Sequence, residues 1–539
     1  MHVLLPTPVG MGLYMSFNTI GWLVVTLLIS ISIWHIAQRK EIILDQFAIT
    51  MLLALICLTI PFFYGDEHAE LATPRLLAVF GGVLLWLALN QIFPSQRKLD
   101  NVLILIVAAI AIQGTFGLVQ FLFFEQGDWL GYDPTRHRPH GSLVQPNVAG
   151  SFQATGILLS CFLISRKKQP LIYESILWSC LIISPFILTL LQSRVGFLGS
   201  IVGLTLVSWY MFAQHKKRAA IVLVVITCSF VSGYFALQHS STVKREAEVY
   251  SNAGERIDIY KVSLAMIAAK PLTGYGYGNF ERAYLDFHNQ MKREDPALAD
   301  PILRLSHPHN EVLFWVIEGG ILPLLAFIIL LIGFYRLLSK VHNWPLKLAL
   351  LGVITPIVLH SQTGWPFYLS LSHWIALILL MWYIKQQSKD CNFSFQLNAA
   401  FLLKSFSLTT VALAVPFFVT TLHTNLIISA FEGGGYKKVE LLQRVINPLP
   451  WKQRLELNTH NFILQQGMTH KDTYKLQVYI DWALKEMRHT PRISLYNNVI
   501  LSLTHIRKHD EAEQIHREAQ TTYPLHDDWG KRIYVEIGN

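Results

Sequence analysis

Long runs of apolar residues recur along the chain up to about residue 423 and predict membrane-spanning helices. They lie near residues 18–37, 46–64, 73–93, 101–124, 147–165, 171–191, 195–213, 219–237, 310–335, 347–361, 367–384 and 400–423. Each run can cross about 30 Å of hydrocarbon as a helix, because a helix satisfies its own backbone hydrogen bonds where water is absent. The pattern therefore predicts an all-α polytopic membrane protein with about 12 transmembrane helices.

The chain changes character after residue 423, where charged residues interrupt the apolar runs. Stretches such as KDTYKLQVYIDWALKEM and DEAEQIHREAQ are rich in helix-forming residues. Apolar side chains recur there at helical spacing, as at Leu441, Val445 and Ile446. We expect a transmembrane domain over residues 1–423, with a large loop at about 238–308, and a C-terminal helical soluble domain over residues 424–539.

The basic residues of the apolar part gather in six short connectors. These connectors contain Arg39-Lys40, Arg97-Lys98, Arg166-Lys167-Lys168, Lys216-Lys217-Arg218, Arg336 with Lys340 and Lys347, and Lys385 with Lys389. Basic connectors mark the cytoplasmic side of a membrane protein, so the net charge of +9 reflects topology and does not indicate nucleic-acid binding. The opposite side then receives GDEHAE, residues 125–146, residues 238–308, HSQTGWPFY and the tail.

Composition agrees with a membrane protein and argues against a metal site. Hydrophobic residues make up 52% and charged residues only 15% of the chain. The five cysteines lie in apolar runs or, for Cys391, in a basic connector, so neither a disulfide framework nor a zinc site is expected. The external segments contain no cluster of carboxylates that resembles a metal site, and we expect no cofactor.

Three arginine-containing segments on the external side depart from the charge rule. Arg194 lies in LQSRVGF, a connector of only a few residues, where a guanidinium is costly unless it faces protein, water or an anion. It is either a snorkelling or salt-bridged residue, or a clamp whose planar fork matches phosphate oxygens. Arg256 in the long loop is either solvated, paired with a neighbour such as Glu255, or a second anion ligand. Arg136 and Arg138 are compatible with contact to lipid headgroups.

Titratable groups also stand at the mouth of one apolar run, in HPHNEVLFWVIEGGILP. Positions 309 and 313 share a helical face, so we expect His309 on the first turn of the span, at the external interface. A histidine there could take a proton from a hydroxyl, or it could be an interfacial residue like His307. Glu318, two turns further on, is either a buried proton carrier or a hydrogen-bond partner between helices.

The segment GYGYGN, residues 274–279, has the glycine content of a phosphate-binding loop. It lacks the Lys-Ser/Thr ending of such a loop and follows no predicted strand. A turn with aromatic packing accounts for it better.

Five segments together resemble the bacterial protein O-oligosaccharyltransferases of the O-antigen ligase/polymerase superfamily. The segments are RPHGSLVQPNVAGSF (138–152), LQSRVGF (191–197), AKPLTGYGYGNF (269–280), HPHNEVLFWVIEGGILP (307–323) and LHSQTGWPFY (359–368). The most specific is His-Asn followed by nine residues and a glycine, here His309, Asn310 and Gly320. Two positions depart from the pattern: Pro323 stands where a second glycine is common, and SQTGWPF lacks the acidic residue that many relatives have.

The resemblance implies a reaction, its partners and a location. A preassembled oligosaccharide would pass from undecaprenyl diphosphate to a Ser or Thr hydroxyl of a periplasmic or pilin protein, without a metal or cofactor. The enzyme would lie in the bacterial inner membrane with its active site facing the periplasm. The resemblance makes His309 the catalytic residue and Arg194 and Arg256 the diphosphate ligands. It places further residues at the sugar or acceptor site: Gln145, His140, Tyr368, Arg138 and Asn310.

Other functions remain open on the sequence. An O-antigen ligase would transfer the same kind of glycan to lipid A-core, and an O-antigen polymerase would extend glycan chains. A transporter could use intramembrane His and Arg residues to gate a solute. The charged residues gather toward one face of the membrane and no inverted repeat is obvious, which disfavours transport.

Overall fold

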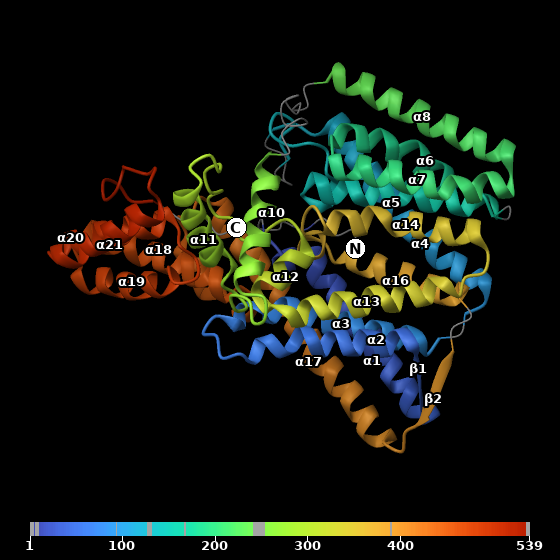
Figure 1. Ribbon diagram of the computed structural model, residues 1–539, viewed down its shortest axis with the longest axis horizontal. Coiled ribbons are helices and arrows are strands. Elements are labelled where there is room, and N and C mark those ends of the chain that lie inside the picture. Colours follow the sequence, from blue (N-terminus) through green and yellow to red (C-terminus); the bar gives the residue numbers. More distant parts are fainter. Residues whose placement is uncertain are drawn as a thin grey trace. The chain divides into compact units, whose positions relative to one another are not determined.

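The computed structural model describes residues 10–92, 94–126, 132–166, 169–240, 254–388 and 391–534, together with Leu5. Within these ranges the chain is mainly helical, with two short strands, and divides into two compact units; the elements are labelled in Figure 1. Unit 1 comprises the described residues of 1–55, 77–252 and 326–419. Unit 2 comprises those of 56–76, 253–325 and 420–539.

Eleven helical segments of the described chain are long and apolar enough to cross a membrane. They are α1 (Ser16–Arg39), α2 (Gln46–Thr59) with η2 (Ile60–Phe63), α3 (Thr73–Asn90) with η3 (Ala69–Ala72), α4 (Gln96–Phe123), α5 (Pro146–Ile164), α6 (Leu171–Leu191), α7 (Arg194–Gln214), α8 (Lys216–Gln238), α13 (Ile321–Ser339), α14 (Trp344–Ser361) and α17 (Ala400–Gly433). The predicted all-α polytopic fold is confirmed. The run predicted at 367–384 forms the one-turn α15 (Pro366–Leu369) and then α16 (Leu371–Gln387), whose 17 residues are at the short end of spanning lengths.

Helix α5 lies at the centre of unit 1. All its residues from Val148 to Ile164 are buried, and it packs against α4, α6, α7 and α14. Glycines allow this close approach. A Cβ at Gly150 would lie 2.5 Å from Ser193 Cβ, and one at Gly156 would lie 2.5 Å from Ile110 Cγ2. Small residues at such contacts are typical of helix packing in membranes.

The described residues of the six basic connectors lie together at one end of unit 1. Strand β1 (Glu41–Asp45) pairs antiparallel with β2 (Asn392–Gln396), with Glu41 opposite Gln396. Polar contacts join the remaining connectors: Lys340 Nζ to Gln46 Oε1 (2.9 Å), Gln387 Nε2 to Gln96 Oε1 (3.0 Å), Arg166 to Asp100 (3.3 Å) and Arg218 to Glu174 (2.6 Å). This common end is what the charge pattern predicts, whereas the small sheet was not predicted.

Unit 2 contains shorter helices. They are α10 (Gly254–Ala269), α11 (Phe280–Glu294), α12 (Glu311–Gly319), and in the tail α18 (Lys452–His470), α19 (Thr473–Glu486), α20 (Ile493–His505) and α21 (His509–Thr522). The tail helices share a core with α11. Leu285 of α11 belongs to the buried cluster around Tyr479 and Tyr496, and Asn289 Nδ2 donates to the carbonyl oxygen of Thr522 at 2.8 Å.

The single span predicted at 310–335 is wrong, because the chain forms two helices there. Gly320 separates α12 from α13 with φ 71° and ψ −143°. A Cβ at this position would lie 2.2 Å from the carbonyl oxygen of Leu272, which accepts a hydrogen bond from Ile321 N at 3.2 Å. A glycine is therefore required where the loop before α11 meets the start of α13.

Glu318 and Arg75 form a buried ion pair at the C-terminal end of α12. Glu318 Oε1 also accepts from the backbone N–H groups of Gly278 (3.0 Å) and Phe280 (3.2 Å). The Arg75 guanidinium carbon lies 4.4–4.5 Å from the ring centroids of three aromatic residues, Tyr277, Phe314 and Trp315. Of the two interpretations of Glu318, the structure supports the hydrogen-bonding one, since the carboxylate is held by fixed donors.

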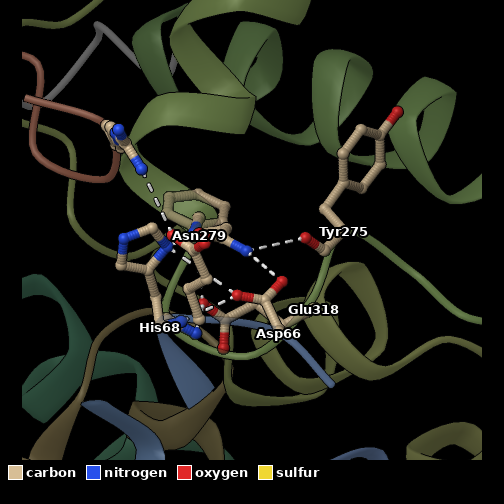
Figure 2. A network of polar contacts seen from close by, with 9 residues as sticks. Asp66, His68, Tyr275, Asn279 and Glu318 are labelled. Atoms are coloured by element: carbon tan, nitrogen blue, oxygen red, sulfur yellow. Dashed lines mark hydrogen bonds and ion pairs between the residues drawn. The ribbon is translucent and has the colours of Figure 1, made fainter. Parts of the chain in front are cut away.

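The GYGYGN segment forms the predicted aromatic turn. Gly274, Gly276 and Gly278 all have φ between 67° and 87°. The Tyr277 hydroxyl donates to the carbonyl oxygen of Leu58 at 2.7 Å. Figure 2 shows Asn279 at the centre of a polar network: its Nδ2 donates to Asp66 Oδ2 (2.5 Å) and to the Tyr275 carbonyl oxygen (3.1 Å).

His68 extends this network toward the tail. Its Nδ1 lies 3.0 Å from Asn279 Oδ1, and its ring centroid lies 4.6 Å from that of His489, next to α19. The segment GDEHAE is thereby joined to the glycine turn on one side and to the tail helices on the other.

We predict that Arg75→Leu destabilises the protein by about 3–5 kcal/mol, because the Glu318 carboxylate would stay buried without its cation. The control is Arg488→Leu, whose ion pair with Glu67 joins side chains that are 65% and 75% exposed. Its loss should cost at most about 1 kcal/mol. Thermal unfolding of the purified full-length variants measures both effects, and equal melting temperatures would contradict the prediction.

Candidate functional site

The His-Asn motif marks the start of α12, and its glycine marks the end. Asn310 is the N-cap, and its Oδ1 accepts from Leu313 N at 3.0 Å. The nine residues between Asn310 and Gly320 are the nine residues of the helix. The spacing of the motif is therefore the length of α12, with a cap at one end and a left-handed glycine at the other.

His309 lies before the helix and not on its first turn, which corrects the expectation from helical spacing. Its φ is 56°, a left-handed conformation that few non-glycine residues adopt. The His309 N–H donates to His307 Nδ1 at 2.8 Å, and the His309 carbonyl oxygen accepts from the Tyr260 hydroxyl at 3.4 Å. Asn310 is the N-cap of α12, so His309 lies outside the helix and its backbone does not have helical angles.

The His309 imidazole is held neutral by its surroundings. Burial, and then the neighbouring His307 and Arg256, lower the pKa of His309 to about 4. Arg256 lies on the first turn of α10, so the structure brings together two of the predicted site residues. At neutral pH the imidazole is therefore in the form that has a free nitrogen lone pair, while burial and the nearby guanidinium oppose its protonated form.

His307 and Glu311 support this arrangement and were missed as partners in the sequence. Since His307 Nδ1 accepts from the His309 N–H, its Nε2 faces Glu311 Oε2 at 3.7 Å. Glu311 Oε1 accepts from Trp315 Nε1 at 2.9 Å. The spacing of four residues between Glu311 and Trp315 places these two on one helical face, whereas His307 precedes the helix and its contact with Glu311 has no helical signal in the sequence.

Arg194 begins α7, directly after a two-residue connector. Ser193 caps this helix: its Oγ accepts from Gly196 N at 3.3 Å and lies 3.0 Å from Asn147 Oδ1. Arg138 Nη1 donates to the carbonyl oxygen of Leu191 at 2.8 Å, at the end of α6. The segments around Arg138 and Arg194 therefore meet at the junction of α6 and α7, in unit 1.

Gln145 and His140 lie on the same stretch as Arg138. Gln145 is the N-cap of α5, and its Oε1 accepts from Val148 N at 2.8 Å. His140 Nδ1 lies 2.9 Å from the carbonyl oxygen of Gly141. Burial is the main cause that lowers the pKa of His140 to about 4, and His137 and Arg138 add to it.

Tyr368 belongs to α15, in the loop between α14 and α16, with its ring 6.3 Å from that of Trp365. One buried hydroxyl holds both ends of this loop. Ser151 Oγ of α5 lies 2.7 Å from His360 Nδ1 of α14 and 3.0 Å from His373 Nε2 of α16. These three residues are far apart in the sequence, so no local pattern could reveal the cluster.

The structure thus gathers the predicted residues in two sets. Unit 2 brings His309 and Asn310 close to Arg256, and unit 1 brings the segments of Arg138, His140, Gln145 and Arg194 together at the ends of α5, α6 and α7. Among the described residues, no three His, Cys, Asp or Glu side chains form a group that could hold a metal ion.

We predict that Ser151→Ala destabilises unit 1 by about 1–3 kcal/mol, because both imidazoles lose a buried hydrogen-bond partner. The matched control is Thr155→Ala on the same helix, whose buried hydroxyl donates to the Ser151 carbonyl oxygen at 2.9 Å. That substitution removes a bond within one helix and should cost less. Thermal unfolding compares the variants. An equal loss of stability in both would contradict the view that Ser151 joins α14 and α16 to α5.

Comparison with known proteins supports the motif assignment. Residues 179–328 match the family described as O-antigen ligase, and residues 348–532 match the C-terminal part of the family described as virulence factor membrane-bound polymerase. The chain is also similar to a general O-oligosaccharyltransferase from Acinetobacter baylyi, at 27% identity over 238 residues. That match covers 41% of this chain and only 40% of the relative's length. The two matched ranges contain four of the five motif segments, all but residues 138–152, and these matches support placing the chain in the O-antigen ligase superfamily.

Proposed function

We propose that the protein is a metal-independent oligosaccharyltransferase that moves a preassembled glycan from undecaprenyl diphosphate to Ser or Thr hydroxyls of periplasmic or pilin proteins. The enzyme lies in the bacterial inner membrane, and the reaction takes place on the periplasmic face. The observation that carries the proposal is the neutral His309 near Arg256, at the start of a short capped helix in a membrane protein.

In this proposal His309 acts as the general base. The acceptor oxygen attacks the anomeric carbon, its proton passes to the His309 imidazole, and the bond from the anomeric carbon to the diphosphate oxygen breaks. Negative charge grows on the departing undecaprenyl diphosphate, and fixed cations stabilise that charge most in the transition state. Arg256 of α10 and Arg194 of α7 have this role, each offering a planar fork that matches phosphate oxygens.

The remaining site residues would shape the sugar and acceptor site. Three of them also fix the backbone: Asn310 and Gln145 cap helices, and Arg138 binds the carbonyl group at the end of α6. We infer that these three act partly by holding helix ends in place. His140 and Tyr368 lie on the adjoining segments and complete the set.

The division into a transmembrane part (1–423) and a periplasmic tail (424–539) is part of the proposal. The tail would help to position the acceptor protein. Since Leu285 and Asn289 of α11 pack into the tail, point substitutions test this role better than a deletion, which would expose part of α11.

Two alternative reactions also have specific support, and comparing strains with and without the gene tests both. The match to the O-antigen ligase family favours transfer to lipid A-core, and the match to the polymerase family favours glycan extension. Mass spectrometry of surface proteins and gel analysis of lipopolysaccharide, with and without the gene, separate them. Loss of glycoprotein with an intact lipopolysaccharide ladder supports the proposal. Loss of the ladder supports a ligase, and altered chain length supports a polymerase.

We predict that His309→Ala lowers glycan transfer by about 10²–10⁴-fold, because the general base is removed, and that Arg194→Ala abolishes it. Both variants should insert into the membrane normally. The control is His342→Ala, since His342 is an exposed histidine in a basic connector. Mass spectrometry of acceptor proteins in complemented strains measures the effect, and retained glycosylation in the His309→Ala strain would refute the assigned role.

The pH dependence of kcat/KM should also report His309. Because its pKa is lowered to about 4, the imidazole remains a neutral base as the pH falls through 6.5 and is protonated only near pH 4. We therefore expect the acidic limb of kcat/KM, which reports the free enzyme, near pH 4. The residual activity of His309→Ala should lack this limb. A midpoint near 6.5 that disappears in the variant would contradict the buried, neutral state.

A further inference from the structure

Helix α10 has an apolar face on each side. Ile259, Val262 and Met266 are buried and pack into the core of unit 2 with Phe280 and Ile317. On the opposite face, Ile257 and Leu264 are 61% and 59% exposed, and Leu272 just beyond the helix is 69% exposed. Positions 257, 261, 264 and 268 are exposed at the spacing of one helical face. We call Ile257, Leu264, Ala268 and Leu272 the outer stripe.

The neighbouring helix α11 shows that this exposure is not general in unit 2. The two helices pack against each other and share one core (Figure 1). The exposed positions of α11 at the corresponding spacing are polar: Asp286, Gln290 and Arg293. A helix that covers a core and faces water has the pattern of α11, whereas an outward apolar stripe needs a partner.

The outer stripe continues into the exposed apolar side of a long apolar helix, α13. The Leu272 carbonyl oxygen accepts from Ile321 N at 3.2 Å, and Ile321 is the first residue of α13. Helix α13 is long and apolar enough to cross a membrane. Ile321 and Leu325 are exposed large apolar residues on its first turns. The stripe therefore ends where a membrane span begins.

Two lysines accompany the stripe. Lys261 lies within it and pairs with Asp295 at 3.2 Å, and Lys270 lies at its end with its ammonium 4.6 Å from the Tyr275 ring centroid. Long side chains of this kind extend an alkyl stem over apolar surroundings and keep the charge at a polar boundary. The two lysines would therefore lie at the polar boundary if the apolar residues of the stripe were inserted at a membrane interface.

We propose that α10 is an interfacial helix whose outer stripe is inserted at the boundary between headgroups and acyl chains of the lipid bilayer. Arg256 immediately precedes Ile257, the first residue of the stripe. The next step rests on the proposed function: the inserted helix holds Arg256 at the membrane depth of a lipid-linked diphosphate. The bilayer thereby serves as the partner that positions a diphosphate ligand.

The depth of the stripe can be measured without reference to activity. Full-length protein with its five cysteines replaced is given a single cysteine by Leu264→Cys or, as the control on α11, by Gln290→Cys. Each is labelled with the fluorophore NBD and reconstituted in phosphatidylglycerol and phosphatidylethanolamine vesicles. We expect the label at 264 to be quenched by lipids spin-labelled near the headgroup and shielded from aqueous iodide, and the label at 290 to show the reverse.

Other results at position 264 overturn the proposal. Quenching by iodide, as at 290, would mean that the stripe faces water. Shielding from both quenchers would mean that protein covers it, from a second copy or from another segment of this chain.

The consequence for the reaction is tested with a second substitution. Leu264→Asp should raise KM for the lipid-linked donor about tenfold, with Leu264→Met close to the parent protein, because a charged side chain opposes insertion. An unchanged KM in a properly folded Leu264→Asp protein refutes the link to Arg256. If the labelled protein has the expected depth but the parent protein transfers no glycan, the proposed function fails and the interfacial helix stands.

Discussion

The ion pair between Arg75 and Glu318 is the contact on which the arrangement around His309 depends. It fixes the last turn of α12, while the aromatic rings around Arg75 and the backbone donors to Glu318 keep both charges satisfied. Because α12 has only nine residues, fixing one end also fixes the other. His309 is therefore held next to a fixed helix start, and its backbone is held further by His307 and Tyr260.

Several motif positions are the starts of helices. Gln145 caps α5, Ser193 caps α7 and Asn310 caps α12, each by accepting a backbone N–H. Such positions combine fixed backbone geometry with the positive end of a helix, where anionic groups are favoured. These motif positions therefore coincide with helix starts, and Arg194 and His309 each lie next to one of the caps.

The apolar runs predicted the spanning helices well, because lipid leaves the backbone few alternatives to a helix. The break at Gly320 was missed because two adjacent apolar helices have the same mean hydropathy as one. The left-handed His309 and the β1–β2 pair depend on contacts with distant segments, which a local pattern does not contain. The apolar runs placed Arg194 in a short connector, but it is the first residue of α7. The Ser151 cluster joins three helices that no sequence spacing connects.

The burial of α5 has a consequence for biogenesis. This helix contains Ser151, which is buried in the finished protein and contacts His360 of α14 and His373 of α16. One of the helices that cover it, α14, is synthesised long after α5 has left the ribosome. During that interval Ser151 is without its final neighbours. Insertion of the early helices and their consolidation are therefore separate events, and the second must wait for the later half of the chain.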